Sequence, residues 1–309
     1  MTKLSIKKGR LSVLVFILPI LLFVSNARAQ QSAFTYTQYM DNLTPLNPAY
    51  SLIDKAGSVS TLARKQLVGI NGSPVTFLFT GNLPIESING AAGLIILDDQ
   101  IAIEQQTEVN AYFAKAIQLG LNDYLAVSLN AGLRNYVAAY TLVSPDDPTF
   151  RNDIRQTKPN LGFGVMYYTD KYYIGLSLPE LTITSLGTAS VQNSINFANH
   201  YYLAGALLTD LNEDIKFKPA TLISYTRGAP LTGDFSGIFY LKDILGIGGD
   251  YRTSKQMAGI LTINADGFHI GYSYQFNVGS NDLGGFNLPT HEVTLCYRFG
   301  KATVNPKLL

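Results

Sequence analysis

The sequence FHIGYSYQF at residues 268–276 alternates strictly between two kinds of side chain. Every even-numbered position is apolar or aromatic, and every odd-numbered position is small or polar. Successive side chains of a β-strand point to opposite faces, whereas a helix would scatter these residues around its whole circumference. The segment therefore predicts a β-strand with one apolar face and one polar face.

Similar alternation recurs through the chain. In residues 292–299, Val, Leu, Tyr and Phe form one face, and Glu, Thr, Cys and Arg form the other. Further alternating segments lie at residues 125–133, 161–167 and 172–178. The alternating segments predict about fourteen strands, beginning near Gly57 and ending at Phe299, and an even number is usual for bacterial barrels.

The connections between these segments are of two lengths. Pairs rich in Gly, Asn and Asp suit tight hairpin turns. They lie at Asn89-Gly90, Asn122-Asp123, residues 169–171, residues 212–214 and Asp266-Gly267. Longer polar or irregular connections lie at residues 143–157, 179–198 and 277–289. Short turns at one end and long loops at the other are typical of outer-membrane barrels.

The composition agrees with a protein that shows an apolar face to lipid. Charged residues make up only 15% of the chain, against roughly 25% in globular domains. Tyr and Phe together number 35, Gly numbers 27, and Trp is absent. A soluble β-sandwich or propeller would also alternate, but here large aromatics face Gly and Ser across the strand, the reverse of a packed soluble core. The predicted fold class is all-β, a transmembrane antiparallel β-barrel.

The first 29 residues have the pattern of a secretory signal peptide. Four basic residues precede an apolar run at residues 11–24, and Ala27-Arg28-Ala29 supplies the small residues of a cleavage site. The alternative, an uncleaved anchor, is disfavoured because a spanning helix needs ~20 apolar residues. We therefore expect an exported chain that begins after Ala29.

Export changes the charge balance. Five of the 23 basic residues and none of the 22 acidic residues lie in the predicted signal peptide, so the mature chain has 18 basic and 22 acidic side chains. Nothing in this balance indicates nucleic-acid binding. The one cysteine, Cys296, excludes an intrachain disulfide.

Few residues could carry chemistry. Asp98-Asp99 could be an acid pair, although such pairs more often end a strand at the membrane edge. His269 and Ser273 share a face but lie about 13 Å apart along a strand, which is too far for a hydrolase pair. His200 and His291 have no partners at metal-ligand spacing.

The single cysteine and a glycine-rich segment are both explained by structure rather than by chemistry. Cys296 faces the predicted lumen with no His at a useful offset, which indicates an inert thiol. The glycines of residues 246–249 lack the Lys-Ser/Thr of a phosphate loop, and glycines permit curvature in a barrel. We predict no enzyme activity, no cofactor and no metal site.

The segment after the signal peptide is not barrel-like. It reads FTYTQYMDN at residues 34–42 and LNPAY at residues 46–50. This resembles the start of the PorP/SprF family, outer-membrane proteins associated with the type IX secretion system of Bacteroidota. In that family a Gln-Tyr-Met-x-Asn motif leads to Asn-Pro-Ala-Tyr. The matching positions are Gln38, Tyr39, Met40, Asn42, Asn47, Pro48, Ala49 and Tyr50.

The resemblance continues over nearly the whole mature chain. A loop similar to the family's Arg-x-Gln-Trp-x-Gly-x-x-Gly-x-Pro motif contains Arg64, Gln66, Gly69, Gly72 and Pro74. Leu67 replaces the usual Trp, and Ser51-Leu52 replaces a glycine that usually follows the Asn-Pro-Ala-Tyr motif. Further similar blocks lie at residues 93–99, 158–168 and 173–179.

The resemblance implies a non-enzymatic role in type IX secretion or gliding motility. The partners that it implies are periplasmic ring or lipoprotein components of the secretion machinery, or a secreted surface adhesin. Outer-membrane lipid would surround the barrel. The rival hypothesis is an outer-membrane channel for small or hydrophobic solutes. A channel should have an open lumen lined by paired charges, whereas the predicted lumen positions are mostly Gly, Ser, Ala and Tyr with few charges, which favours a closed or plugged barrel.

The predicted organisation has four parts: a signal peptide at residues 1–29, a short N-terminal periplasmic arm at residues 30–56, an outer-membrane β-barrel at residues 57–300, and a C-terminal tail at residues 301–309. The motif at residues 38–50 is either a docking surface or plug at the periplasmic mouth, or an extended arm that only covers the barrel end. Pro45 and Pro48 favour an extended path.

Overall fold

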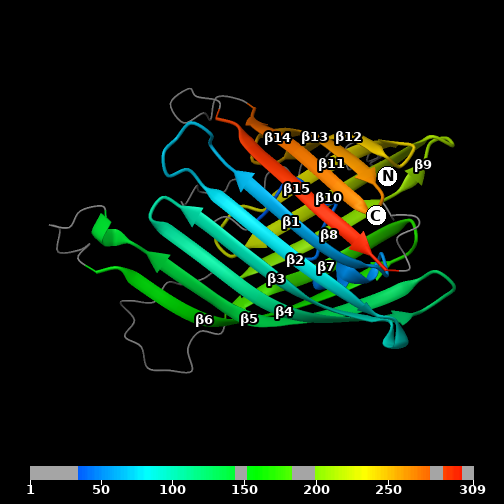
Figure 1. Cartoon of the computed structure of the whole chain (residues 1–309), viewed down its shortest axis with the longest axis horizontal. Coiled ribbons are helices and arrows are strands. Elements are labelled where there is room, and N and C mark those ends of the chain that lie inside the picture. Colours follow the sequence, from blue (N-terminus) through cyan, green and yellow to red (C-terminus); the bar gives the residue numbers. More distant parts are fainter. Residues whose placement is uncertain (1–33, 143–151, 183–198, 279–287, 301–309) are drawn as a thin grey trace, which may run out of the picture.

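The computed structural model describes residues 34–142, 152–182, 199–278 and 288–300. Fourteen antiparallel strands form a closed ring in which the first strand pairs with the last (Figure 1). The two-residue β9 (Thr209–Asp210) is a short addition that pairs with β10 beyond β8. The ring strands are β1 (Gly57–Lys65), β2 (Val75–Ile85), β3 (Gly90–Ile101), β4 (Glu104–Gln118), β5 (Tyr124–Ala138), β6 (Ile154–Tyr168), β7 (Tyr172–Thr182), β8 (His200–Leu207), β10 (Ile215–Thr226), β11 (Thr232–Leu241), β12 (Leu245–Arg252), β13 (Gln256–Ala265), β14 (Phe268–Asn277) and β15 (Thr290–Phe299).

The predicted fold class is confirmed. The ring begins at Gly57 and ends at Phe299, and these two residues pair directly where β1 meets β15. Closure pairs each strand of the ring with a neighbour on both sides, which is how a sheet satisfies its main-chain groups in a membrane interior. Among the described residues no helix is long and apolar enough to cross a membrane. The predicted signal peptide and C-terminal tail lie outside the described residues.

The two ends of the barrel differ. At the turn end, where Gly57 begins β1, short connections join the strands at the predicted Asn/Asp/Gly positions. The opposite end, the loop end, contains the longer connections. Two of the predicted loops are shorter than expected, because β6 already begins at Ile154 and β7 continues to Thr182. The sequence pattern predicts these residues as loops because they are polar. A strand that extends beyond the apolar belt no longer faces lipid, so it needs no apolar side chains at those positions.

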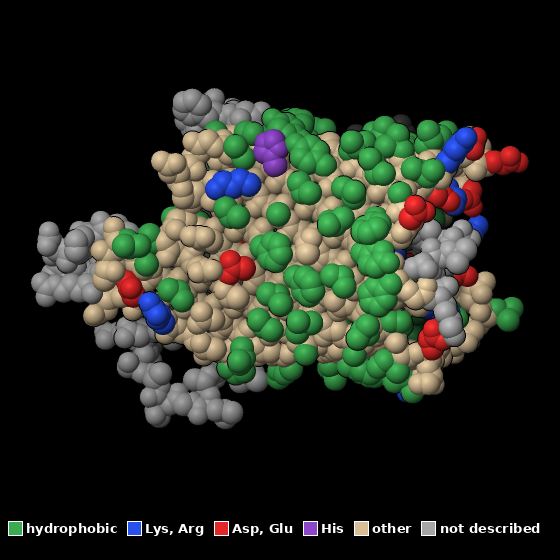
Figure 2. All heavy atoms as spheres, viewed as in Figure 1, with side chains coloured by type: hydrophobic (Ala, Val, Ile, Leu, Met, Phe, Trp, Pro, Cys, Tyr) green, Lys and Arg blue, Asp and Glu red, His purple; other side chains and the backbone are tan. Residues whose placement is uncertain are grey.

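The outer wall carries an apolar belt. Large aliphatic and aromatic side chains cover the middle of the barrel, and charged side chains gather towards its ends (Figure 2). Aromatic pairs lie near both ends of this belt. Phe217 and Phe239 stack 4.5 Å apart towards the turn end, and Tyr201 and Tyr225 lie 6.0 Å apart towards the loop end. An apolar band with aromatic girdles is the surface of a barrel embedded in lipid.

The lumen is occupied by residues 34–56, here called the inner segment. Tyr36, Tyr39, Met40 and Leu43 are completely inaccessible to solvent and form a core with lumen-facing residues such as Ile238 and Leu222. The inner segment enters β1 at the turn end (Figure 1). Residues 34–56, the described part of the predicted N-terminal arm, lie within the ring of strands, and their side chains pack against lumen-facing wall residues.

Candidate functional site

The inner segment folds into turns rather than an extended path. The 3-10 helix η2 (Pro48–Leu52) follows Asn47, whose side-chain oxygen accepts a hydrogen bond from the Ala49 N–H at 3.2 Å. The expectation that Pro48 would favour an extended chain is wrong. Proline is well suited to the first position of a helix, where its N–H would have no helical partner and its φ is already suitable.

The motif residues Gln38 to Asn42 contact three strands of the lumen wall. The Gln38 backbone N–H donates to the Glu292 carboxylate on β15 at 2.8 Å. The Tyr39 hydroxyl lies 2.8 Å from the Ser236 hydroxyl on β11. The Asn42 amide donates to the Thr80 hydroxyl on β2 at 2.9 Å. The predicted motif therefore spans the lumen rather than lying along one strand.

Asn47 fits into a glycine-lined recess between β6 and β7. Its amide donates to the carbonyls of Val165 and Leu176, at 3.2 and 3.3 Å. A Cβ at Gly164 would lie 2.1 Å from the Asn47 oxygen, and a Cβ at Gly175 would lie 2.8 Å from its nitrogen. These distances are below any normal contact, so both strands need glycine here for Asn47 to approach their main chain. Beside this recess, the Tyr50 ring packs edge-on against Tyr173 at 5.6 Å.

Several wall side chains bind main-chain atoms of the inner segment. Glu292 accepts hydrogen bonds from two consecutive N–H groups, those of Thr37 and Gln38. Three donors bind carbonyl oxygens: Arg64 binds that of Thr35 at 2.9 Å, Lys218 that of Met40 at 2.6 Å, and Tyr202 that of Phe34 at 2.8 Å. Asn82 binds the carbonyls of Ser51 and Ala56.

Asp41 is the charged centre of the inner segment. Its carboxylate lies 3.9 Å from the Lys218 ammonium and 3.5 Å from His269 Nε2, and it accepts a hydrogen bond from Tyr240 at 3.3 Å. Burial would raise the pKa of Asp41, but His269, Lys218 and Arg298 together hold that pKa below its ordinary value. One carboxylate thus joins the inner segment to β10, β11 and β14.

A second charged cluster lies on the opposite wall. The Arg134 guanidinium on β5 bonds Glu108 at 2.7 Å and also contacts Glu180 on β7. His200 Nε2 lies 4.0 Å from Glu180. The β6–β7 register shifts between Leu161 and Phe163, and this bulge turns Glu180 into the lumen.

The second family motif divides between two places. Arg64 is 6% exposed and lies in the lumen, 3.6 Å from Glu292. Gln66, Gly69, Gly72 and Pro74 form the β1–β2 connection at the loop end, where the Gln66 N–H donates to the Pro74 carbonyl. Gly69 and Gly72 have φ of +109° and +73°, a region that glycine adopts without strain. The structure therefore brings only Arg64 together with the first motif.

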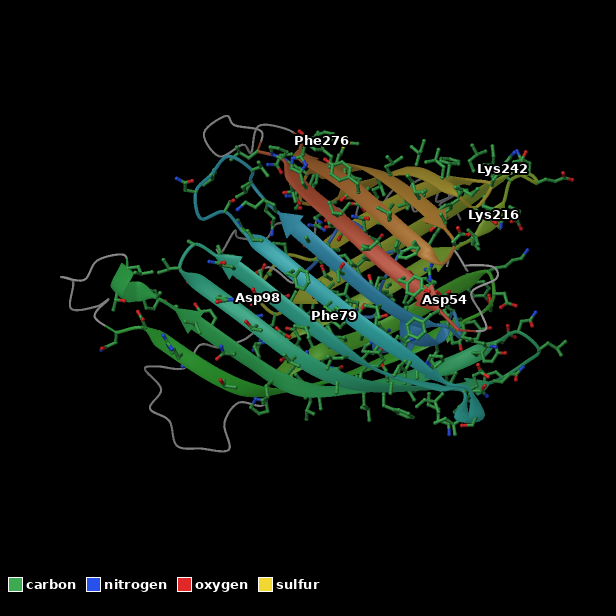
Figure 3. The ribbon with its side chains drawn as sticks, viewed as in Figure 1. Asp54, Phe79, Asp98, Lys216, Lys242 and Phe276 are labelled. Atoms are coloured by element: carbon green, nitrogen blue, oxygen red, sulfur yellow. The ribbon has the colours of Figure 1, made fainter. Side chains whose placement is uncertain are left out.

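The other candidates occupy separate positions. Asp99 faces the lumen and bonds Thr76, whereas Asp98 faces outwards and bonds Thr107, so the two carboxylates do not form a pair. Figure 3 shows Asp98 on β3 near Phe79 of β2, and Asp54, Lys216 and Lys242 towards the turn end. Cys296 is buried. In the described ranges no three His, Cys, Asp or Glu side chains are grouped to hold a metal ion.

The inner segment and the wall enclose a small cavity. A cavity lined by Phe34, Pro45, Leu46 and Glu180, among others, holds about 20 Å³, about the space of one water molecule. The expectation that lumen positions carry few charges is wrong, because buried ion pairs line the wall. The pairs are Arg64–Glu292, Arg134–Glu108, Arg134–Glu180 and Arg252–Asp234.

Sequence reasoning missed most of the wall residues that hold the inner segment. Glu292, Lys218, Tyr202 and Asn82 were not singled out, although Glu292 had been placed on the polar face of its strand. A usable signal was present: a Lys at residue 218 on the polar face of a strand predicted to cross lipid needs a partner inside the lumen.

Solved structures with a similar fold are outer-membrane barrels. "CymD monoaromatic hydrocarbon channel" matches with a TM-score of 0.50 at 11% identity, over 88% of this chain and 95% of that chain. The Acinetobacter baumannii outer membrane protein Omp33 matches with a TM-score of 0.45 at 8% identity, over 79% and 98%. The Pseudomonas putida toluene transporter TodX matches with a TM-score of 0.44 at 8% identity, over 86% and 94%. At such identity only the barrel fold is shared.

No curated protein sequence matches the chain. The family described as "Type IX secretion system membrane protein PorP/SprF" matches residues 27–297. This match spans the inner segment, with both of its motif blocks, and all but the last two residues of the ring of strands. The chain belongs to the PorP/SprF family of type IX secretion system membrane proteins.

Proposed function

We propose that this protein is a non-enzymatic, protein-binding component of type IX secretion or gliding machinery in the bacterial outer membrane. In this role it binds periplasmic ring or lipoprotein components, or a secreted surface adhesin. A signal peptide cleaved after Ala29 directs its export. The family and the barrel fold fit an outer-membrane location.

The observation that carries this proposal is the occupied lumen. Solute passage requires a continuous water-filled path, whereas Tyr36, Tyr39, Met40 and Leu43 lie fully buried inside the ring. Each of these side chains packs within a core that includes lumen-facing wall residues. A barrel filled in this way presents its ends and loops, rather than a pore, to other molecules.

The test is a crosslinking pull-down of the full-length tagged protein from native outer membranes. Heat-modifiable migration on a gel first verifies that the barrel is folded. Recovery of a secretion-ring lipoprotein or a large surface adhesin would support the proposal and show which of the two classes of partner the protein binds. Recovery of the barrel alone, with steady ion conductance in planar bilayers, would contradict it.

The second candidate is a channel for small or hydrophobic solutes. It is favoured by the buried ion pairs along the wall, such as Arg134 with Glu108, because paired charges also line solute channels. A channel requires the inner segment to leave the lumen or to rearrange. Conductance that is absent in the native protein and appears only after residues 34–53 are displaced would favour this function.

A further inference from the structure

We infer that the lumen wall is a peptide-binding site that recognises main-chain groups. The inner segment occupies this site in cis, and a peptide from a partner protein can occupy it in trans. The inference deepens the proposed function, on which it rests for the source of that peptide. The ligand class is a nearly uncharged, aromatic-bearing peptide, because residues 34–53 contain one charged side chain, Asp41.

The first support is the kind of contact that the wall makes. Glu292, Arg64, Lys218 and Tyr202 bind N–H and carbonyl groups of residues 34–40. Glu292 is fully buried, and Lys218 is 1% exposed. A buried charge is costly unless it is paired and hydrogen-bonded. These side chains therefore form a prebuilt cradle for a peptide backbone, which any peptide of suitable shape can share.

The second support is that the inner segment is not part of the sheet. Its backbone–backbone hydrogen bonds in the described chain join its own residues, such as Asn47 to Leu43 and Ile53 to Tyr50. No strand of the ring takes up its N–H or carbonyl groups through main-chain pairing. Removing the segment therefore breaks no strand pairing, and the ring stays closed through β1 and β15.

The third support is that some buried polar atoms where the inner segment meets the wall have no hydrogen-bond partner in the described chain. Gln38 Oε1 and Thr294 Oγ1 are buried without a hydrogen-bond partner in the described chain. Both residues line a crevice with Tyr36 and Asn42. Leaving a buried polar group without a hydrogen-bond partner is destabilising. Hydrogen-bonding capacity is therefore left at this contact, and a peptide of different sequence can use it.

The experiment uses the full-length chain with a glycine-flanked protease site inserted after Lys55. Lys55 is exposed and has a φ of +52°, a conformation that glycine accepts. After cleavage in detergent micelles, the inner segment remains bound only by its contacts. The probe is a fluorescent synthetic peptide of residues 34–53, and its binding to the cleaved barrel is followed by anisotropy.

The inference predicts saturable binding of the probe, competition by unlabelled peptide and no binding of a scrambled peptide. Glu292→Gln and Lys218→Met should each weaken binding about tenfold or more, because each removes a charge-assisted hydrogen bond. Tyr202→Phe removes a single hydroxyl and should weaken binding several-fold, which keeps the test valid even where a charge variant misfolds.

The matched control for Lys218→Met is Lys216→Met, because Lys216 lies two residues away on β10 and pairs with Asp243 instead of the inner segment. Its effect should stay within about twofold. A cleaved segment that never exchanges, or a probe that binds all three wall variants as tightly as the native barrel, overturns the inference. The anisotropy measurement does not depend on the pull-down. A failed pull-down would therefore count against the proposed function without deciding whether the lumen wall binds a peptide.

Discussion

Asn47 lies where it does because residue 164 has no side chain: a Cβ at Gly164 would come within 2.1 Å of the Asn47 side-chain oxygen. The contact joins the start of a short helix to the wall of the barrel, since the same oxygen accepts a hydrogen bond from the Ala49 N–H. The recess is therefore a point at which a single methyl group should disturb the inner segment.

Gly164→Ala should displace Asn47 and lower the free energy of unfolding by about 1–3 kcal/mol, the usual cost of overpacking. The measurement is the midpoint of urea unfolding in detergent micelles. The control is Gly259→Ala on β13, where no atom lies within 4 Å of the added Cβ. Equal midpoints for the two variants would show that the recess does not constrain Asn47.

Glu292 and Arg64 should be energetically coupled. Glu292→Gln leaves the Arg64 guanidinium buried without its ion partner, and breaking such a pair costs about 3–5 kcal/mol. Adding Arg64→Met should cost less than the sum of the two single changes, because the second change removes the unpaired charge. A double-mutant cycle on urea unfolding measures the coupling, and strict additivity would rule it out.

A charge placed in the apolar belt should be costly. Leu129 on β5 is 69% exposed on the outer wall, and Leu129→Arg should destabilise the barrel by about 2–4 kcal/mol in lipid. Leu121→Arg is the control, because Leu121 is 93% exposed in the β4–β5 turn. Unfolding in lipid vesicles compares them. A Leu129→Arg barrel as stable as the control would mean that this wall does not face lipid.

The Asp41 network predicts a loss of stability in acid. The folded-state pKa of Asp41 is lowered, so its contribution is fully present above the unfolded pKa of about 3.9 and disappears as pH falls through the folded value. The difference in stability between the native protein and Asp41→Asn should therefore be constant above about pH 5 and shrink below about pH 4. A difference that does not change between pH 6 and pH 3 would contradict this account.

The fold could be predicted because alternation is a local property. The segment at residues 268–276 defined its own strand without reference to any other, and the Asn/Asp/Gly pairs located the turns. The pairing of Gly57 with Phe299 followed from closure, which a sheet in lipid requires.

The site could be predicted only in part, because its contacts join distant residues. Gln38 and Glu292 are 254 positions apart, and alternation shows which face of a strand a residue lies on, not which residue it meets across the lumen. Glu180 illustrates a second limit. Strict alternation from Tyr172 would place Glu180 outside with Leu176, and the bulge at β6–β7 instead turns it towards Arg134.

The pairing of β1 with β15 also sets an order of events in assembly. Residues 34–56 precede the first strand of the ring, and the seam that encloses them needs Thr290 to Phe299, near the other end of the chain. The inner segment must therefore either lie among the strands before β15 pairs with β1, or enter the barrel after the ring has closed. Closure of the β1–β15 seam therefore separates two routes: insertion before closure needs an open sheet, and insertion after closure needs passage through one end of the barrel.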